Sequence, residues 1–143
     1  MIKSVFAPAF MAISLISVVL TGTALAQTPS PEGARVYFIE PAEGSEIEGP
    51  VKVTFGLSRI GVAPAGTDKP KTGHHHLLID TKLEDYTSSI PKDDKHLHFG
   101  GGQTETVITL TPGKHTLQLI LGDKDHIPHS PPIQSEIITI FVK

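Results

Sequence analysis

Eight histidines are the residues of this 143-residue chain whose type and spacing could do chemistry. They are His74, His75, His76, His96, His98, His115, His126 and His129. An imidazole ring nitrogen binds divalent metals, titrates near neutral pH and also serves as an ordinary hydrogen-bonding group. The chemistry that this composition indicates is therefore metal binding or a polar network, and either one requires the fold to bring distant histidines together.

The three consecutive histidines cannot all point the same way if they lie on a β-strand. Alternate side chains of a strand share a face. His74 and His76 therefore lie on one face, while His75 points with Leu77 and Ile79 toward an apolar core. This phase predicts ligand roles for the outer two histidines and a supporting or core role for His75.

A second pair with the same two-residue spacing, His96 and His98, lies before a Gly-Gly-Gly triplet that gives the backbone room to turn or to approach another group closely. The predicted metal ligands are His74, His76, His96, His98, His126 and His129. The residues predicted to orient these ligands or to offer oxygen atoms are His75, Asp80, Glu105, Asp123 and Asp125. The six imidazoles could equally form a hydrogen-bonded network without a metal, and the sequence leaves both interpretations open.

The ligand types restrict the metal. The chain has no cysteine, and its two methionines, Met1 and Met11, precede the expected mature protein. Imidazoles with an optional carboxylate suit Cu(II), Zn(II) or Ni(II) better than Cu(I). We expect Cu(II) or Zn(II).

Strand patterns account for most of the sequence after residue 34. Runs of apolar, β-branched or alternating residues, separated by Gly and Pro, mark seven strands. They lie at 35–39, 51–57, 74–80, 95–99, 104–110, 115–121 and 134–142. No helical pattern is convincing. The sequence therefore predicts an all-β fold, a single immunoglobulin-like antiparallel β-sandwich of about seven strands.

Strand direction places most of the histidines at one end of such a sandwich. Consecutive antiparallel strands alternate in direction, so successive loops alternate between two ends. On this count seven histidines lie at the end where the strand at 51–57 finishes, provided that 95–99 is a strand. His115 alone lies at the other end, where it follows the turn Pro112-Gly113 and is expected to bond to the backbone.

The first residues resemble an export signal. Lys3 precedes an apolar run from Val5 to Leu20, and Ala24-Leu25-Ala26 has the pattern of a cleavage site. We expect residues 1–26 to be a Sec-type signal peptide, 27–34 a flexible leader and 35–143 the sandwich domain. The mature chain would then have 117 residues (143 minus 26) and be periplasmic or secreted. Without cysteine it would be neither a lipoprotein nor disulfide-bonded.

Charge excludes some partners. The net charge of −3 becomes −4 without Lys3, with 11 basic against 15 acidic residues. A negative chain without a basic cluster does not suit nucleic acid or an anionic membrane, and no second apolar span indicates membrane insertion. The sequence does not reveal whether the chain has a protein partner, and the partner for which it offers ligands is a metal ion.

Several motifs resemble one family. They are Val36 to Pro41, Gly61 to Gly66, Gly73 to Asp80, His98 to Glu105 and Pro112 to Asp123, with His126, His129, Pro131 and Pro132. Together they look like an uncharacterised exported bacterial family, domain of unknown function number 4399, of immunoglobulin-like type. The resemblance covers nearly all of the expected mature chain. It supports the fold and implies no catalytic or binding residue.

Three functions fit these observations, and the first is a periplasmic metal-binding protein, a carrier or buffer for Cu(II) or Zn(II). The alternative is a non-enzymatic binding or structural module of the cell envelope with a hydrogen-bonded histidine network and no metal. A metal-dependent hydrolase with Glu105 or Asp80 as base would need an open coordination position. Because no known catalytic motif accompanies the histidines, we expect that the protein is not an enzyme.

Overall fold

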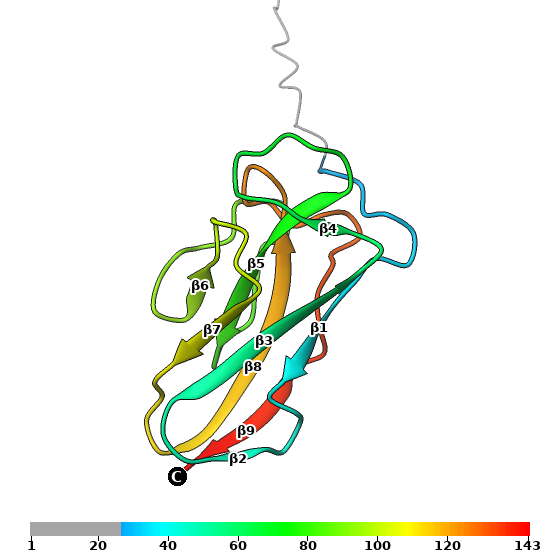
Figure 1. The fold of residues 1–143 in the computed structure, drawn as a ribbon. Coiled ribbons are helices and arrows are strands. Elements are labelled where there is room, and N and C mark those ends of the chain that lie inside the picture. The colour runs from blue at the N-terminus through cyan, green and yellow to red at the C-terminus, as the bar shows by residue number, and fades with distance from the viewer. Residues whose placement is uncertain (1–26) are drawn as a thin grey trace, which may run out of the picture.

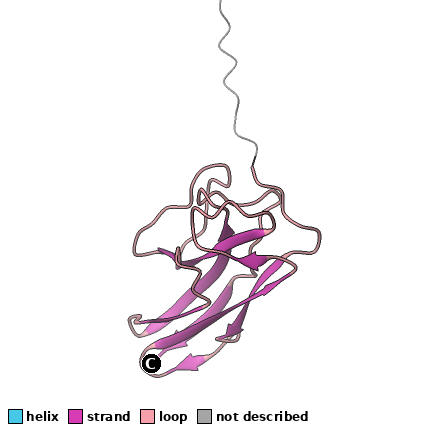
Figure 2. Cartoon of the chain, turned by 45° about the horizontal axis from the view of Figure 1, so that its top comes forward, coloured by secondary structure: helices cyan, strands magenta, loops and turns pink. Residues whose placement is uncertain are grey.

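The computed structural model describes residues 27–143, which form nine strands and no helix (Figure 2). The strands are β1 (Arg35–Glu40), β2 (Glu46–Ile47), β3 (Val51–Ser58), β4 (Gly61–Val62), β5 (Thr72–Ile79), β6 (His96–His98), β7 (Glu105–Ile108), β8 (Gly113–Gly122) and β9 (Ile138–Val142). Within these residues no helix is available that could cross a membrane. The expected signal peptide, residues 1–26, lies outside the described residues.

The strands form two sheets packed face to face (Figure 1). The small sheet has the order β1-β3-β7, and the large sheet the order β2-β9-β8-β5-β4, with β6 also paired to β5. All pairings are antiparallel except β2 with β9 and β4 with β5. The prediction of an immunoglobulin-like β-sandwich is confirmed. Residues 27–143 form nine strands instead of the predicted seven. The two additional strands, β2 and β4, have two residues each and are too short to show a periodic pattern in the sequence.

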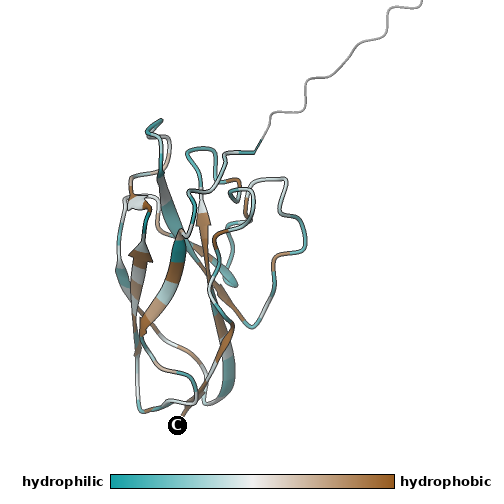
Figure 3. Ribbon diagram, turned by 90° about the vertical axis from the view of Figure 1, so that its right-hand side faces the viewer, coloured by the Kyte–Doolittle hydropathy of each residue, from teal (hydrophilic) through white to brown (hydrophobic). Residues whose placement is uncertain are grey.

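The main core lies between the two sheets. Leu77, Leu117, Leu119 and Leu121 of the large sheet are completely buried against side chains of the small sheet such as Phe55. Figure 3 shows that hydrophobic segments run along the strands of the sandwich. The alternation of side chains predicted for residues 115–121 is therefore confirmed. Leu117, Leu119 and Leu121 point into the core, and Ile120 points to the outer face of the large sheet.

A second, smaller core covers the outer face of the large sheet. Leu78 of β5 and Ile120 of β8 are completely buried there, beneath Leu83 and Ile90 of the segment that joins β5 to β6. That segment thus acts as a lid over the sheet. As a result β5 is buried on both faces, which explains why its sequence alternates so poorly in hydrophobicity.

The leader is bonded to the domain. Pro29 forms a bridge with Ser130, the Ser130 N–H donates to the Thr28 carbonyl at 2.9 Å, and the Ser30 N–H donates to the Ser130 carbonyl at 3.1 Å. The loop after β8 offers backbone groups to which the leader bonds.

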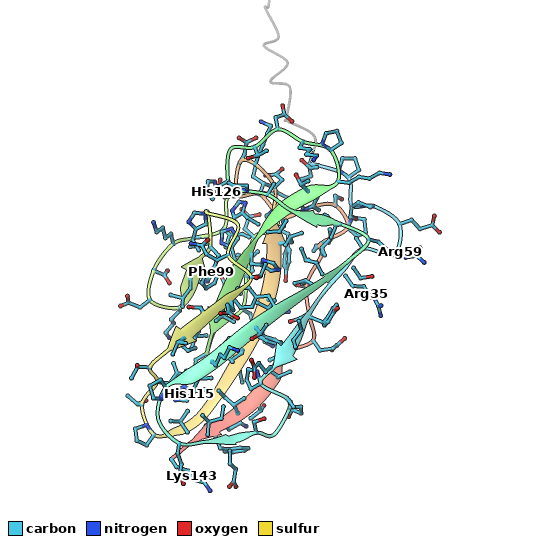
Figure 4. All side chains as sticks on the ribbon, viewed as in Figure 1. Arg35, Arg59, Phe99, His115, His126 and Lys143 are labelled. Atoms are coloured by element: carbon cyan, nitrogen blue, oxygen red, sulfur yellow. The ribbon has the colours of Figure 1, made fainter. Side chains whose placement is uncertain are left out.

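His115 lies at the end of the sandwich opposite the loop after β8 (Figure 4) and forms an ion pair with Asp80. Its Nδ1 lies 2.7 Å from the carboxylate and its Nε2 lies 2.8 Å from the Thr111 carbonyl. Both partners are acceptors, so both ring nitrogens donate and the ring is an imidazolium. The bond to Asp80, with that to Thr111, raises the pKa of His115. Burial raises the pKa of Asp80, but the bonds from the Thr116 N–H and His115 outweigh it and lower that pKa.

Replacing Asp80 with asparagine should destabilise the fold in a pH-dependent way. Asparagine tolerates the left-handed backbone at this position, where φ is 53°, but it carries no charge. Because the folded protein binds the His115 proton more tightly than the unfolded chain does, the pair adds stability below about pH 6.5. Because the folded protein keeps Asp80 ionised more readily, the pair adds stability above about pH 4. Because Asp80 is partly exposed, we expect a loss of about 1 kcal/mol at pH 5.5 and less at pH 8.5, measured by urea unfolding. An equal loss at both pH values, or a matching effect of Asp94→Asn at an exposed position, would contradict this account.

Candidate metal centre

Three strand-borne histidines converge on the outer face of the large sheet. His76 of β5 lies opposite His98 of β6 and Ile120 of β8, and His74 lies opposite Gly122. The pleat of β5 turns His74 and His76 to this outer face and leaves His75 on the core face. Phase and register together thus bring residues from two distant parts of the chain side by side.

The spacing of these rings suits a single metal ion. The Nε2 atoms of His74 and His76 are 3.0 Å apart, and the ligand atoms of His74, His76 and His98 all lie within 4.8 Å of one another. Two nitrogens bound tetrahedrally to zinc are about 3.3 Å apart, given zinc–nitrogen distances of about 2.05 Å. The three rings could reach one ion with only small side-chain movements.

A fourth ring, that of His126, completes the cluster. Its centroid is 4.9 Å from the ring of His74, 4.8 Å from that of His98 and 6.1 Å from that of His76. His126 belongs to the loop after β8, at the end of the molecule opposite His115 (Figure 4). The loop parity that placed it at this end of the sandwich is therefore correct in the structure.

Two glycines make room for the rings. A Cβ atom on Gly122 would lie 2.9 Å from His76 Nε2 and 3.3 Å from the His126 Cα. A Cβ atom on Gly100, the first of the glycine triplet, would lie 2.2 Å from the His98 ring. Any larger residue at either position would displace a ring of the cluster, so the absence of side chains here is part of the site.

Burial keeps the rings neutral. His74 and His76 are at most 1% exposed. Burial, followed by the charges of neighbouring imidazoles, lowers the pKa of His76 to about 2 and that of His74 to about 4, although Asp123 opposes the shift at His74. Burial and His126 also lower the pKa of His98. A neutral imidazole has a free nitrogen lone pair, which is the form that binds a metal.

Two ring nitrogens of the cluster are buried without a hydrogen-bond partner. They are His76 Nδ1 and His98 Nε2. A buried polar atom without a partner costs about 1–3 kcal/mol. The protein retains these polar groups within its folded interior, so the histidine cluster is poorly explained by packing alone.

Two predicted ligands lie outside this cluster. His96 Nδ1 bonds to the Asp93 carboxylate at 2.8 Å, and the strand register places His96 opposite Leu78 instead of a histidine. His129 is buried, and neither of its ring nitrogens has a hydrogen-bond partner. Pro128 forms a β-bridge with Gly122. Because successive side chains of an extended segment point to opposite faces, His129 is directed away from the face that carries the cluster.

Two of the residues predicted to support the ligands, His75 and Asp123, lie close to the cluster but in different surroundings. His75 packs against Phe55 at a ring distance of 4.8 Å, and its Nδ1 lies 3.2 Å from the Gln103 carbonyl. Burial lowers the pKa of His75 to about 4. Asp123 is buried near the cluster and bonds within the loop that carries His126.

The other three carboxylates do not support the site. Asp80 pairs with His115 at the opposite end of the sandwich, and Asp125 is exposed and pairs with Lys124. Glu105 lies on the small sheet, 3.9 Å from Lys52. The prediction of supporting roles for these residues is wrong. Strand phase and proximity in sequence did not specify which sheet or end Asp80 and Glu105 occupy, and Asp125 lies on the same loop as His126 but is exposed.

Fold and site together define an immunoglobulin-like β-sandwich with a buried histidine cluster on the outer face of its large sheet. The chain belongs to the family described as "Domain of unknown function (DUF4399)", which matches residues 53–143. This match confirms the resemblance found in the sequence motifs. It assigns no activity to any residue.

Other comparisons add little. No curated protein matches the chain. Among solved structures, it is similar to one described as "Structures of Clostridium thermocellum CbhA fibronectin(III)-like modules". The identity is 20%, the TM-score is 0.40, and the match covers 76% of this chain and 95% of the other.

The metal-free protein should lose stability as the pH falls below about 6.5. Unfolded histidines take up protons there, whereas the lowered pKa values of His74, His75 and His76 prevent their uptake in the fold. Each such histidine contributes about 1 kcal/mol per pH unit between pH 6 and pH 4.5. The variant His76→Gln should therefore show a shallower decline by that amount in urea unfolding. Parallel curves for the two proteins would show that His76 is not held neutral.

Proposed function

We propose that this protein binds one divalent transition-metal ion, Cu(II) or Zn(II), and acts as a non-enzymatic carrier or buffer in the cell envelope. The observation that carries the proposal is the convergence of His74, His76 and His98, whose ligand atoms all lie within 4.8 Å of one another. The rings come from two strands of one sheet, which is a rigid support. Burial holds them neutral and ready to bind.

The donor set supports these two ions. Imidazole nitrogens without thiolate or thioether neighbours suit Zn(II) and Cu(II), and the general order of affinities favours Cu(II). Three imidazoles leave the fourth position of a tetrahedral ion open, but no known catalytic motif accompanies them. The buried Asp123 also accepts hydrogen bonds from loop N–H groups through Oδ1 and from Thr28 through Oδ2. It is therefore poorly suited to act as a base.

One observation favours the alternative of a metal-free polar network. The 3.0 Å distance between His74 Nε2 and His76 Nε2 is also that of a hydrogen bond between a donating and an accepting ring. Such a network would serve a structural or binding module. The buried His98 Nε2, which lacks a partner, counts against it, because a network that stabilises a fold satisfies its members.

Calorimetric titration of the metal-free exported protein with Zn(II) and with Cu(II) tests the proposal. We expect one saturable equivalent, and a free energy of unfolding raised by about 2.7 kcal/mol when the free metal is 100 times the dissociation constant. His76→Gln should abolish or strongly weaken binding, whereas His115→Gln, at the opposite end, should not. The absence of saturable heat with an unchanged melting temperature would refute metal binding and leave the network.

Gly122→Ala should weaken metal binding without removing any ligand. The added methyl would lie 2.9 Å from His76 Nε2, so that ring must move away from its partners. We expect an affinity loss of about tenfold or more by the same titration. Gly61→Ala is the matched control, because its methyl would meet nothing closer than 3.6 Å. Equal affinities for the two variants would show that the ion does not lie beside Gly122.

A further inference from the structure

The loop that carries His126 has no regular structure and is held by one carboxylate. Asp123 Oδ1 accepts the N–H groups of Asp125 at 2.9 Å and Ile127 at 3.0 Å. The His126 N–H donates to the Asp123 carbonyl at 3.0 Å, and the Asp123 N–H donates to the Ile127 carbonyl at 2.9 Å. These bonds hold His126 in the left-handed region, with φ at 67°, a conformation that few non-glycine residues adopt.

The second oxygen of the same carboxylate is bound by the leader. Thr28 Oγ1 donates to Asp123 Oδ2 at 2.7 Å. Asp123 is only 5% exposed, so this hydroxyl meets an otherwise buried charged atom. A hydrogen bond to a charged acceptor in such a place is among the stronger kinds. The leader therefore helps to fix the residue that shapes the His126 turn.

The leader also joins this loop to the lid between β5 and β6. The Gln27 side-chain amide donates to the carbonyls of Pro128, at 3.0 Å, and Tyr86. Within the lid, the Ile90 N–H donates to the His126 carbonyl at 2.9 Å. Three segments far apart in the sequence therefore meet around His126.

We propose that His126 is the fourth metal ligand and that residues 27–30, here called the strap, position it through Asp123. This inference rests on the proposed metal site formed by His74, His76 and His98. Ring distances of 4.8 to 6.1 Å place His126 beside all three strand-borne rings. With the strap bound, four imidazoles enclose the ion. Without it, His126 moves with its loop and the site keeps three ligands and an open position.

The strap thus sets whether the centre is closed or open. Structural zinc sites have four protein ligands, while sites with three leave a position for water or another molecule. Thr28 is accordingly a positioning residue, because its hydroxyl acts on the ion only through Asp123 and His126. Residues that orient a ligand in this manner change metal affinity by about 10- to 100-fold.

A double-mutant cycle on Thr28 and His126 tests the inference. Thr28→Val removes the hydroxyl at nearly constant volume, and Thr28→Ser restores it. Thr54→Val is the matched control, because Thr54 Oγ1 makes a similar 2.8 Å bond to the Glu40 carboxylate on the small sheet. Zn(II) affinity would be measured by competition titration. The absorption of bound Co(II) would report geometry, since four-coordinate tetrahedral Co(II) absorbs far more strongly than higher-coordinate Co(II).

Thr28→Val should weaken Zn(II) binding by about tenfold and change the Co(II) absorption spectrum, because water would replace one imidazole nitrogen. Thr28→Ser and Thr54→Val should match the unaltered protein. In the His126→Gln background, Thr28→Val should have no further effect, because the ligand on which it acts is gone. An equal loss in both backgrounds would overturn the positioning role.

Two other outcomes separate this inference from the function on which it rests. Unchanged Zn(II) affinity and Co(II) absorption in His126→Gln would remove His126 from the ligand set while leaving the three-histidine site in place. A lack of metal binding by the unaltered protein would overturn both proposals.

Discussion

The burial of β5 on both faces is the constraint on which the rest of the structure depends. One face contributes Leu77 and Ile79 to the core between the sheets, and the other lies beneath the lid that joins β5 to β6. His74 and His76 lie on that second face and are removed from water. Removal from water disfavours the imidazolium form, so the rings are neutral and their nitrogens must find partners within the protein or in a bound ion.

Strand phase and loop parity were enough to predict much of the site. Phase separated His74 and His76 from His75, and parity placed His98 and His126 at the same end of the sandwich. Strand phase wrongly predicted that His96 is a metal ligand, because His96 shares a strand face with His98. Two residues along a strand span almost 7 Å, and the β5 register puts His96 opposite Leu78. Register between distant strands is a tertiary property that one sequence does not reveal.

The lid and the strap could not be predicted for a related reason. Residues 81–95 and 27–30 lack a periodic apolar pattern, and they are ordered by contacts to groups far away in the sequence, such as the packing of Leu83 in the cluster that contains Leu78 and the bond from Thr28 to Asp123. Contacts between residues far apart in the sequence also explain why Asp80 and Glu105 were wrongly predicted to support the metal site. A carboxylate near a histidine in sequence can lie on another sheet or at the far end of a sandwich, and only the three-dimensional structure shows this.

Three converging imidazoles, a fourth ring beside them and two glycines that leave space for the rings all follow if an ion completes the cluster. The most direct measurement is a crystal structure of the Zn(II)-loaded protein with data collected on both sides of the zinc absorption edge. The account predicts one strong anomalous peak at bonding distance from ring nitrogens of His74, His76 and His98. A structure with that position empty, and with zinc bound only at surface residues, would contradict it.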